Sequence, residues 1–174
     1  FLNASRRVAA EQKRALEVVR IGASPEMNGF ATENPGVFTS HGDLDEEAAL
    51  PLLARCDLLY AMYPGGRRYE RFRRTSLPIK LSTYVQAQRP IFVHSPADSG
   101  LARIVGAARV GSVCVSEDES EISRQIRDTV EARVPRESFE ALRQELMGAD
   151  QVRQLGAALE GRDWRSFPEN DFRS

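Results

Sequence analysis

Short apolar segments that alternate with helix-like segments constrain the fold of this chain more than any other feature. Five runs are rich in β-branched residues, and most are continuously apolar, which is typical of strands buried on both faces. They span residues 16–21, 37–41, 57–63, 90–95 and 110–115. Because strands and helices alternate, we expect an α/β, Rossmann-like fold with a doubly wound, mostly parallel sheet.

The segments between these strands carry helix signals. Asp45 can cap one helix, Pro78 can open another at its first position, and Ser116 with Glu119 forms a capping box for a third, which carries Ile122, Ile126 and Val130. The other expected helices span residues 5–15, 46–55, 99–107, 135–148 and 150–161, and the one that Pro78 opens runs to residue 88. We expect one domain over residues 1–134, with residues 135–174 adding helices and a tail that pack on it.

The charge balance argues against a nucleic-acid-binding protein. The 174 residues carry a net charge of −1, and a general nucleic-acid binder would be much more basic. Only two of the 24 basic residues are lysines, Lys13 and Lys80. Arginine is therefore the default cation, and each lysine stands out.

The reactive side chains are few. Cys56 and Cys114 lie in apolar runs, so we expect buried free thiols and a reducing, cytoplasmic compartment. His41 and His94 are the only histidines, and no metal-ligand spacing occurs, so we expect no metal. No apolar run reaches the roughly 18 residues of a membrane span. Because the sequence begins with Phe1, we expect a piece of a larger protein.

Residues 75–84 (TSLPIKLSTY) form the most informative segment. A helix that begins at the carboxyl edge of a parallel sheet offers free N–H groups and a favourable dipole to an anion. Ser76, Lys80 and Thr83 are spaced to share one helix face, which suits a phosphate and an adjoining sugar. The alternative is an ordinary helix with a solvated lysine.

A second cluster is an arginine-rich segment at the same expected edge. Residues 64–77 (PGGRRYERFRRTSL) read as a long loop between a strand and a helix. Its local positive field could meet a diphosphate, an anionic lipid headgroup or an acidic glycan, or the loop could simply be solvated. The cations are Arg67, Arg68, Arg71, Arg73 and Arg74.

Two strand ends complete the candidates. His41, Gly42 and Asp43 follow one strand and could line a base pocket. His94 ends another strand, where a structural role is the usual one, with Asp98 as a candidate partner. The sequence contains no nucleophile elbow, phosphate-binding P-loop or dinucleotide-binding turn, so those enzyme classes lack their usual support.

Three segments, taken in order, resemble the C-terminal, donor-binding half of a GT-B retaining glycosyltransferase. HGDLDEEAALPLLARCDLLYAMYP resembles the family's glycine-ended strand, short helix and "a-Asp-hydrophobic" strand. SLPIKLSTYVQAQRPIFV is similar to its Ser-x-Pro-x-Lys-Leu-x-Glu-Tyr helix with the following turn and strand, and SGLARIVGAARVGSVCVSEDESEI resembles its last loop, helix and strand. Together they cover about residues 37–130.

The resemblance implies half of a GT-B fold that binds a nucleoside diphosphate sugar, with no other cofactor. Sugar would be transferred to an acceptor hydroxyl in a cleft against a separate N-terminal half, in bacterial-type polysaccharide or glycoconjugate synthesis. A lipid-linked acceptor would bring a peripheral membrane contact. By position, the donor-binding residues would be His41, Gly42, Asp43, Thr75, Ser76, Pro78, Lys80, Leu81, Thr83, Ser99 and Gly100.

Three positions depart from the family pattern. Thr75 and Thr83 stand where the family has paired glutamates, and Arg103 replaces the glutamate of its Gly-x-x-Glu turn. The family's Arg-Lys pair for diphosphate follows an earlier strand that this chain lacks. These departures keep other hypotheses open: a non-catalytic GT-B-like scaffold, half of a sugar-nucleotide epimerase, and an unrelated receiver-like or flavodoxin-like module.

Overall fold

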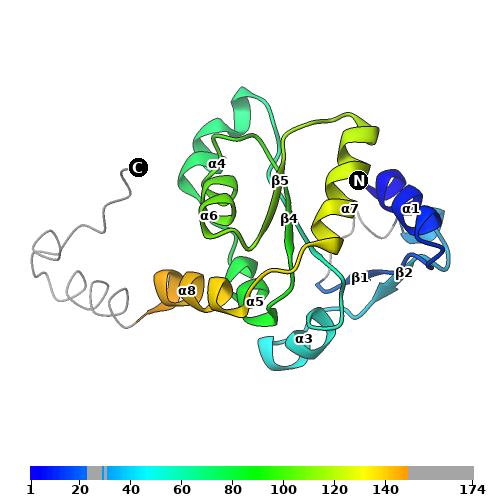
Figure 1. The fold of residues 1–174 in the computed structure, drawn as a ribbon, viewed down its shortest axis with the longest axis horizontal. Helices are drawn as coiled ribbons and strands as arrows, with labels where there is room; N and C mark the ends of the chain where they lie inside the picture. Colours follow the sequence, from blue (N-terminus) through cyan, green and yellow to red (C-terminus); the bar gives the residue numbers. More distant parts are fainter. Residues whose placement is uncertain (23–28, 30, 149–174) are drawn as a thin grey trace, which may run out of the picture.

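The fold is α/β, as the alternating pattern predicted. A computed structural model describes residues 1–22, 29 and 31–148 (Figure 1). All five expected strands form, although each is shorter than its apolar run. They are β1 (Val18–Arg20), β2 (Phe38–Ser40), β3 (Leu59–Met62), β4 (Ile91–His94) and β5 (Gly111–Cys114).

The expected single sheet is divided into two parallel sheets. One has the order β3-β4-β5 and the other contains β1 and β2. Register is regular in both, with Val18 opposite Phe38 and Ala61 opposite Val93. The prediction of one continuous sheet is wrong for the described residues, because within them neither β1 nor β3 has a hydrogen-bonded strand on its second side.

The helices follow the predicted order with small differences at their ends. The expected helix over residues 150–161, the tail, and residues 23–28 and 30 lie outside the described residues. The helices are α1 (Leu2–Glu11), α3 (Glu46–Leu53), α4 (Glu70–Thr75), α5 (Lys80–Ala87), α6 (Gly100–Ala108), α7 (Glu119–Glu131) and α8 (Arg136–Met147), with a 3-10 turn η1 (Arg67–Tyr69).

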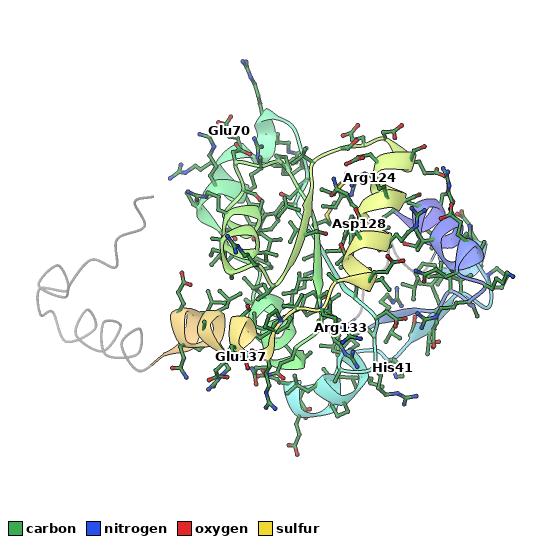
Figure 2. The ribbon with its side chains drawn as sticks, in the orientation of Figure 1. His41, Glu70, Arg124, Asp128, Arg133 and Glu137 are labelled. Carbon is green, nitrogen blue, oxygen red and sulfur yellow. The ribbon has the colours of Figure 1, made fainter. Side chains whose placement is uncertain are left out.

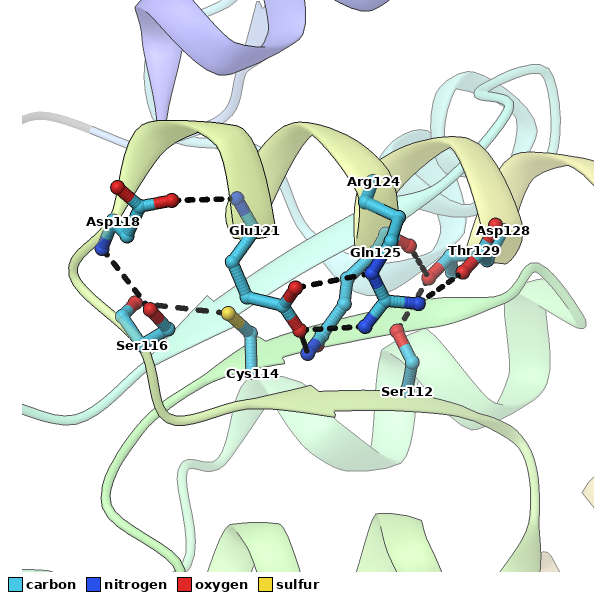
Figure 3. Close-up of polar contacts among 9 residues, drawn as sticks. All are labelled: Ser112, Cys114, Ser116, Asp118, Glu121, Arg124, Gln125, Asp128 and Thr129. Atoms are coloured by element: carbon cyan, nitrogen blue, oxygen red, sulfur yellow. Dashed lines mark hydrogen bonds and ion pairs between the residues drawn. The ribbon is translucent and has the colours of Figure 1, made fainter.

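Side-chain caps explain where two of these helices begin. The Asp45 carboxylate accepts the Ala48 N–H at 2.8 Å, which confirms the predicted cap of α3. The predicted capping box at the start of α7 is wrong. Asp118 caps this helix by accepting the Glu121 N–H at 2.9 Å, while the Ser116 hydroxyl, two residues before Asp118, accepts the Asp118 N–H (Figure 3).

Helices cover both faces of the three-stranded sheet, as a doubly wound arrangement requires. On one face α1 and α7 pack together, and Phe92 joins Val8 and Ile122 in an apolar cluster. On the other face α5, α6 and α8 pack over Ile91 and Val93 (Figure 1). Adjacent residues of β4 therefore point into different cores, which explains why its sequence is continuously apolar.

Both cysteines are free thiols, as expected, but their burial differs. Cys114 is fully buried in the α7-side core, whereas Cys56 is only half-buried. Among the described residues, no helix has the length and apolarity needed to cross a membrane.

Candidate functional site

The candidate site lies at the carboxyl end of β3 and β4, where residues 64–79 cross from β3 to α5. The sequence predicted a loop here, and that prediction is wrong for its centre, which forms η1 and α4. Local contacts explain the helix. Arg74 pairs with Glu70 one turn away at 3.2 Å, and Thr75 donates its hydroxyl hydrogen to the Arg71 carbonyl at 2.8 Å. The Phe72 ring also packs edge-on against Tyr63.

An ion pair fastens this segment to the turn between β4 and α6. Arg73 contacts both carboxylate oxygens of Asp98, with Nε at 2.7 Å from Oδ1 and Nη2 at 2.9 Å from Oδ2. Its remaining nitrogen, Nη1, donates to the Gly66 carbonyl at 2.8 Å. Arg73 is only 9% exposed. We predicted it as a ligand contact, but its guanidinium is committed to this Arg73–Asp98 clamp.

Asp98 is shared between two arginines. Arg74 Nε donates to Asp98 Oδ2 at 2.8 Å, and the hydrogen bonds from Arg73 and Arg74 lower the pKa of Asp98 to about 2. The predicted pairing of His94 with Asp98 is therefore wrong. His94 instead hydrogen-bonds to the Tyr60 hydroxyl at 3.4 Å and to the Ser116 carbonyl at 2.9 Å, so its role here is structural.

The chain between α4 and α5 is extended, which separates residues that we expected on one helix face. Ser76 ends α4 in an extended conformation and accepts a hydrogen bond from the Tyr63 hydroxyl at 3.3 Å. Only Lys80 and Thr83 belong to α5. Pro78 comes two residues before Lys80, the first residue of α5, rather than at the first position of the helix, and its carbonyl accepts the Leu81 N–H at 2.9 Å.

Lys80 is the cation best placed for an anionic ligand. It is the first residue of α5, and its ammonium lies 5.8 Å from the centroid of the Tyr84 ring. Although the residue is exposed overall, partial burial of the ammonium lowers the pKa of Lys80. A desolvated ammonium gains more from a neighbouring anion than a fully hydrated one does. Leu81, predicted beside it, is buried in the core instead.

The start of α6 lies against the same extended chain. Ser99 is fully buried, and its hydroxyl caps α6 by accepting the Ala102 N–H at 3.0 Å, so this side chain is not presented to a ligand. Gly100 allows the close approach, since a Cβ there would lie 3.3 Å from the Ser76 carbonyl oxygen and 3.6 Å from that of Arg74. The start of α6 thus lies against the backbone that leads from α4 to α5.

The predicted base pocket does not join this site. His41, Gly42 and Asp43 follow β2, which belongs to the separate two-stranded sheet. Figure 2 shows His41 beside α3, well away from Glu70 of α4 across the molecule. The structure therefore brings Gly100 against the backbone of Ser76, in the segment that also contains Thr75, Pro78 and Lys80, whereas His41–Asp43 follow a strand of the other sheet.

The sequence did not predict that two residues, Asp98 and Tyr63, hold the arginine-rich segment in place. Asp98 holds Arg73, and Tyr63 holds both Ser76 and Phe72. Tyr63 directly follows β3 and Asp98 lies in the turn between β4 and α6, positions that favour contact with the carboxyl-edge segments. Their partners, however, could not be read from spacing.

No family model and no curated protein sequence matches the chain. Within the described residues, no group of three His, Cys, Asp or Glu side chains is arranged to hold a metal ion. A cavity of about 220 Å³ lies at the start of β5, away from Lys80, and is lined partly by Arg109, Ser112 and Thr129.

Proposed function

We propose that the chain binds the diphosphate of a nucleoside diphosphate sugar at the carboxyl end of β3 and β4, as the donor-binding half of a glycosyltransferase. The observation that carries this proposal is the position of Lys80 at the first residue of α5, where its ammonium is partly desolvated. Helix starts and a cation at the carboxyl edge of a parallel sheet together favour an anion.

In this proposal the chain contributes binding and charge stabilisation. Lys80 would face the diphosphate, the N–H groups at the start of α5 would donate hydrogen bonds to its oxygens, and Thr83 would contact the ribose or sugar. Stabilising the charge that develops on the leaving diphosphate is electrostatic catalysis. The acceptor and the other half of the cleft would come from a separate N-terminal half, in polysaccharide or glycoconjugate synthesis.

Titration calorimetry with UDP, GDP and ADP tests the donor site. We expect weak binding of at least one nucleotide and a roughly tenfold or greater loss in Lys80→Gln, because charge-assisted hydrogen bonds are about twice as strong as neutral ones. Lys13→Gln is the matched control, since Lys13 is the other lysine and is exposed. Equal binding by both variants, or no binding of any nucleotide, would refute the donor site.

A non-catalytic scaffold is the second candidate, and one observation favours it. Thr75, at a position where the resembling family has a glutamate, uses its hydroxyl within α4 by donating to the Arg71 carbonyl. Its hydroxyl hydrogen is thus engaged along its own helix, although the residue is exposed. If nucleotide binds but the chain joined to its other half releases no nucleoside diphosphate from any donor, the scaffold hypothesis is favoured over the enzyme.

A further inference from the structure

Large apolar side chains are exposed along the segment that crosses the carboxyl edge. Tyr69 is 38% exposed, Phe72 52%, Leu77 40% and Ile79 94%. They fall within eleven consecutive residues, whereas single exposed apolar residues elsewhere need no explanation. Such a concentration is typical of an interaction surface.

Exposed cations are interleaved with these apolar side chains. Arg67, Arg68 and Arg71 are all exposed, and Arg68 lies over the Tyr69 ring at 5.4 Å from its centroid. Residues 64–79 contain five arginines but one acidic residue, Glu70, which is paired with Arg74. The segment is therefore strongly positive although the whole chain carries a net charge of −1.

The segment is held in place rather than left loose. The Arg73–Asp98 clamp ties α4 to the turn between β4 and α6, and the Phe72 ring rests on Tyr63 with the centroids 5.2 Å apart. In Figure 2, nitrogen-tipped side chains project outward around Glu70, at one end of the molecule. The exposed side chains are thus presented on a rigid support.

We propose that the exposed side chains of residues 67–79, which we name the docking ridge, bind an anionic membrane surface. Aromatic and aliphatic side chains enter the headgroup boundary, and arginines beside them attract anionic lipid headgroups. Positive charge and exposed apolar side chains occur together in this one segment. A membrane surface can bind both, because it offers anionic headgroups beside an apolar interior. The contact does not depend on donor binding.

Co-sedimentation with vesicles tests the docking ridge. We expect the chain to sediment with vesicles of phosphatidylcholine and phosphatidylglycerol, much less with phosphatidylcholine alone, and less again at high salt. Replacing Arg67, Arg68 and Arg71 with Gln should lower the partition coefficient on the order of 100-fold. The matched control replaces the exposed residues Arg55, Arg133 and Arg136 with Gln and should sediment as the unmodified chain does.

A second variant tests the apolar contribution without disturbing the fold. Ile79→Ser should weaken sedimentation several-fold, since Ile79 is almost fully exposed, while Met147→Ser on α8 should have no effect. Equal sedimentation on neutral and anionic vesicles, or no sedimentation, would overturn the proposal. Loss with the arginine variant but not with Ile79→Ser would also overturn it, because it would mean electrostatic adsorption without insertion.

Discussion

At the scale of single residues, the carboxylate of Asp98 organises the candidate site. It holds one nearly buried arginine and one exposed arginine, and those two partners lie 25 and 24 positions earlier in the chain. The arginine cluster was visible in the sequence, but the sequence did not show which arginines are structural and which face solvent. Arg73 is structural, whereas Arg67, Arg68 and Arg71 face solvent.

Asp98→Asn should destabilise the fold, because it leaves the Arg73 guanidinium nearly buried without its counter-charge. We expect a clear drop in the midpoint of urea unfolding. Asp128→Asn is the matched control, since Asp128 pairs with Arg124 at 2.9 Å on the exposed surface and such pairs contribute little. Equal midpoints for the two variants would contradict the role of the clamp.

The same carboxylate gives a pH dependence with a defined sign. The pKa of Asp98 falls from 3.8 to about 2 on folding, so its contribution to stability is complete above 3.8 and is lost as the pH falls to about 2. Glu121 and Glu140 behave in the same direction, so unfolding midpoints must be compared between the unmodified chain and Asp98→Asn. The difference between the two unfolding midpoints should shrink as the pH falls from 3.8 to about 2.

At the scale of elements, local signals predicted the existence of helices better than their starts. The sequence placed the α7 cap at Ser116, but Asp118 has the side chain that reaches the first free N–H groups. Both residues are polar and two positions apart, and only the path of the chain after β5 decides between them (Figure 3). The segment between β3 and α5 was predicted as a loop because its helix is short and its stabilising contacts are partly tertiary.

Asp118→Ala should lower the free energy of unfolding by about 1 kcal/mol, the usual cost of losing an N-terminal cap. Ser116→Ala should cost less, since its hydroxyl accepts one turn-type hydrogen bond outside the helix. Chemical denaturation of both variants provides the measurement. A larger effect at Ser116 than at Asp118 would restore the capping box that the sequence predicted.

At the scale of the whole molecule, α8 is part of the core rather than an appendage. It packs against α5 and α6 and buries Phe139 and Leu142 in the cluster that also contains Val93. Helix α8, which follows β5 and α7 in the chain, therefore completes the helical layer on the α5 and α6 face of the three-stranded sheet. Its amphipathic pattern was visible in the sequence, but its partner face was not.

Phe139→Ala should lower the free energy of unfolding by about 3–5 kcal/mol, the range for deleting a buried aromatic side chain. Phe139 is 2% exposed. Met147→Ala, on the same helix but exposed, should change the free energy by no more than about 0.5 kcal/mol. A cost at Phe139 as small as that at Met147 would mean that α8 is not docked on the core.

The sequence by itself determined the α/β class, the positions of the five described strands along the chain and the segments that carry charge. These features depend on hydrophobic periodicity and charge within a few consecutive residues. Only the tertiary structure decided that β1 and β2 form their own sheet, that His41 lies across the molecule from Glu70, and that Asp98 holds Arg73. Strand partners and ion pairs join residues far apart in the chain, and their choice depends on how the elements pack together.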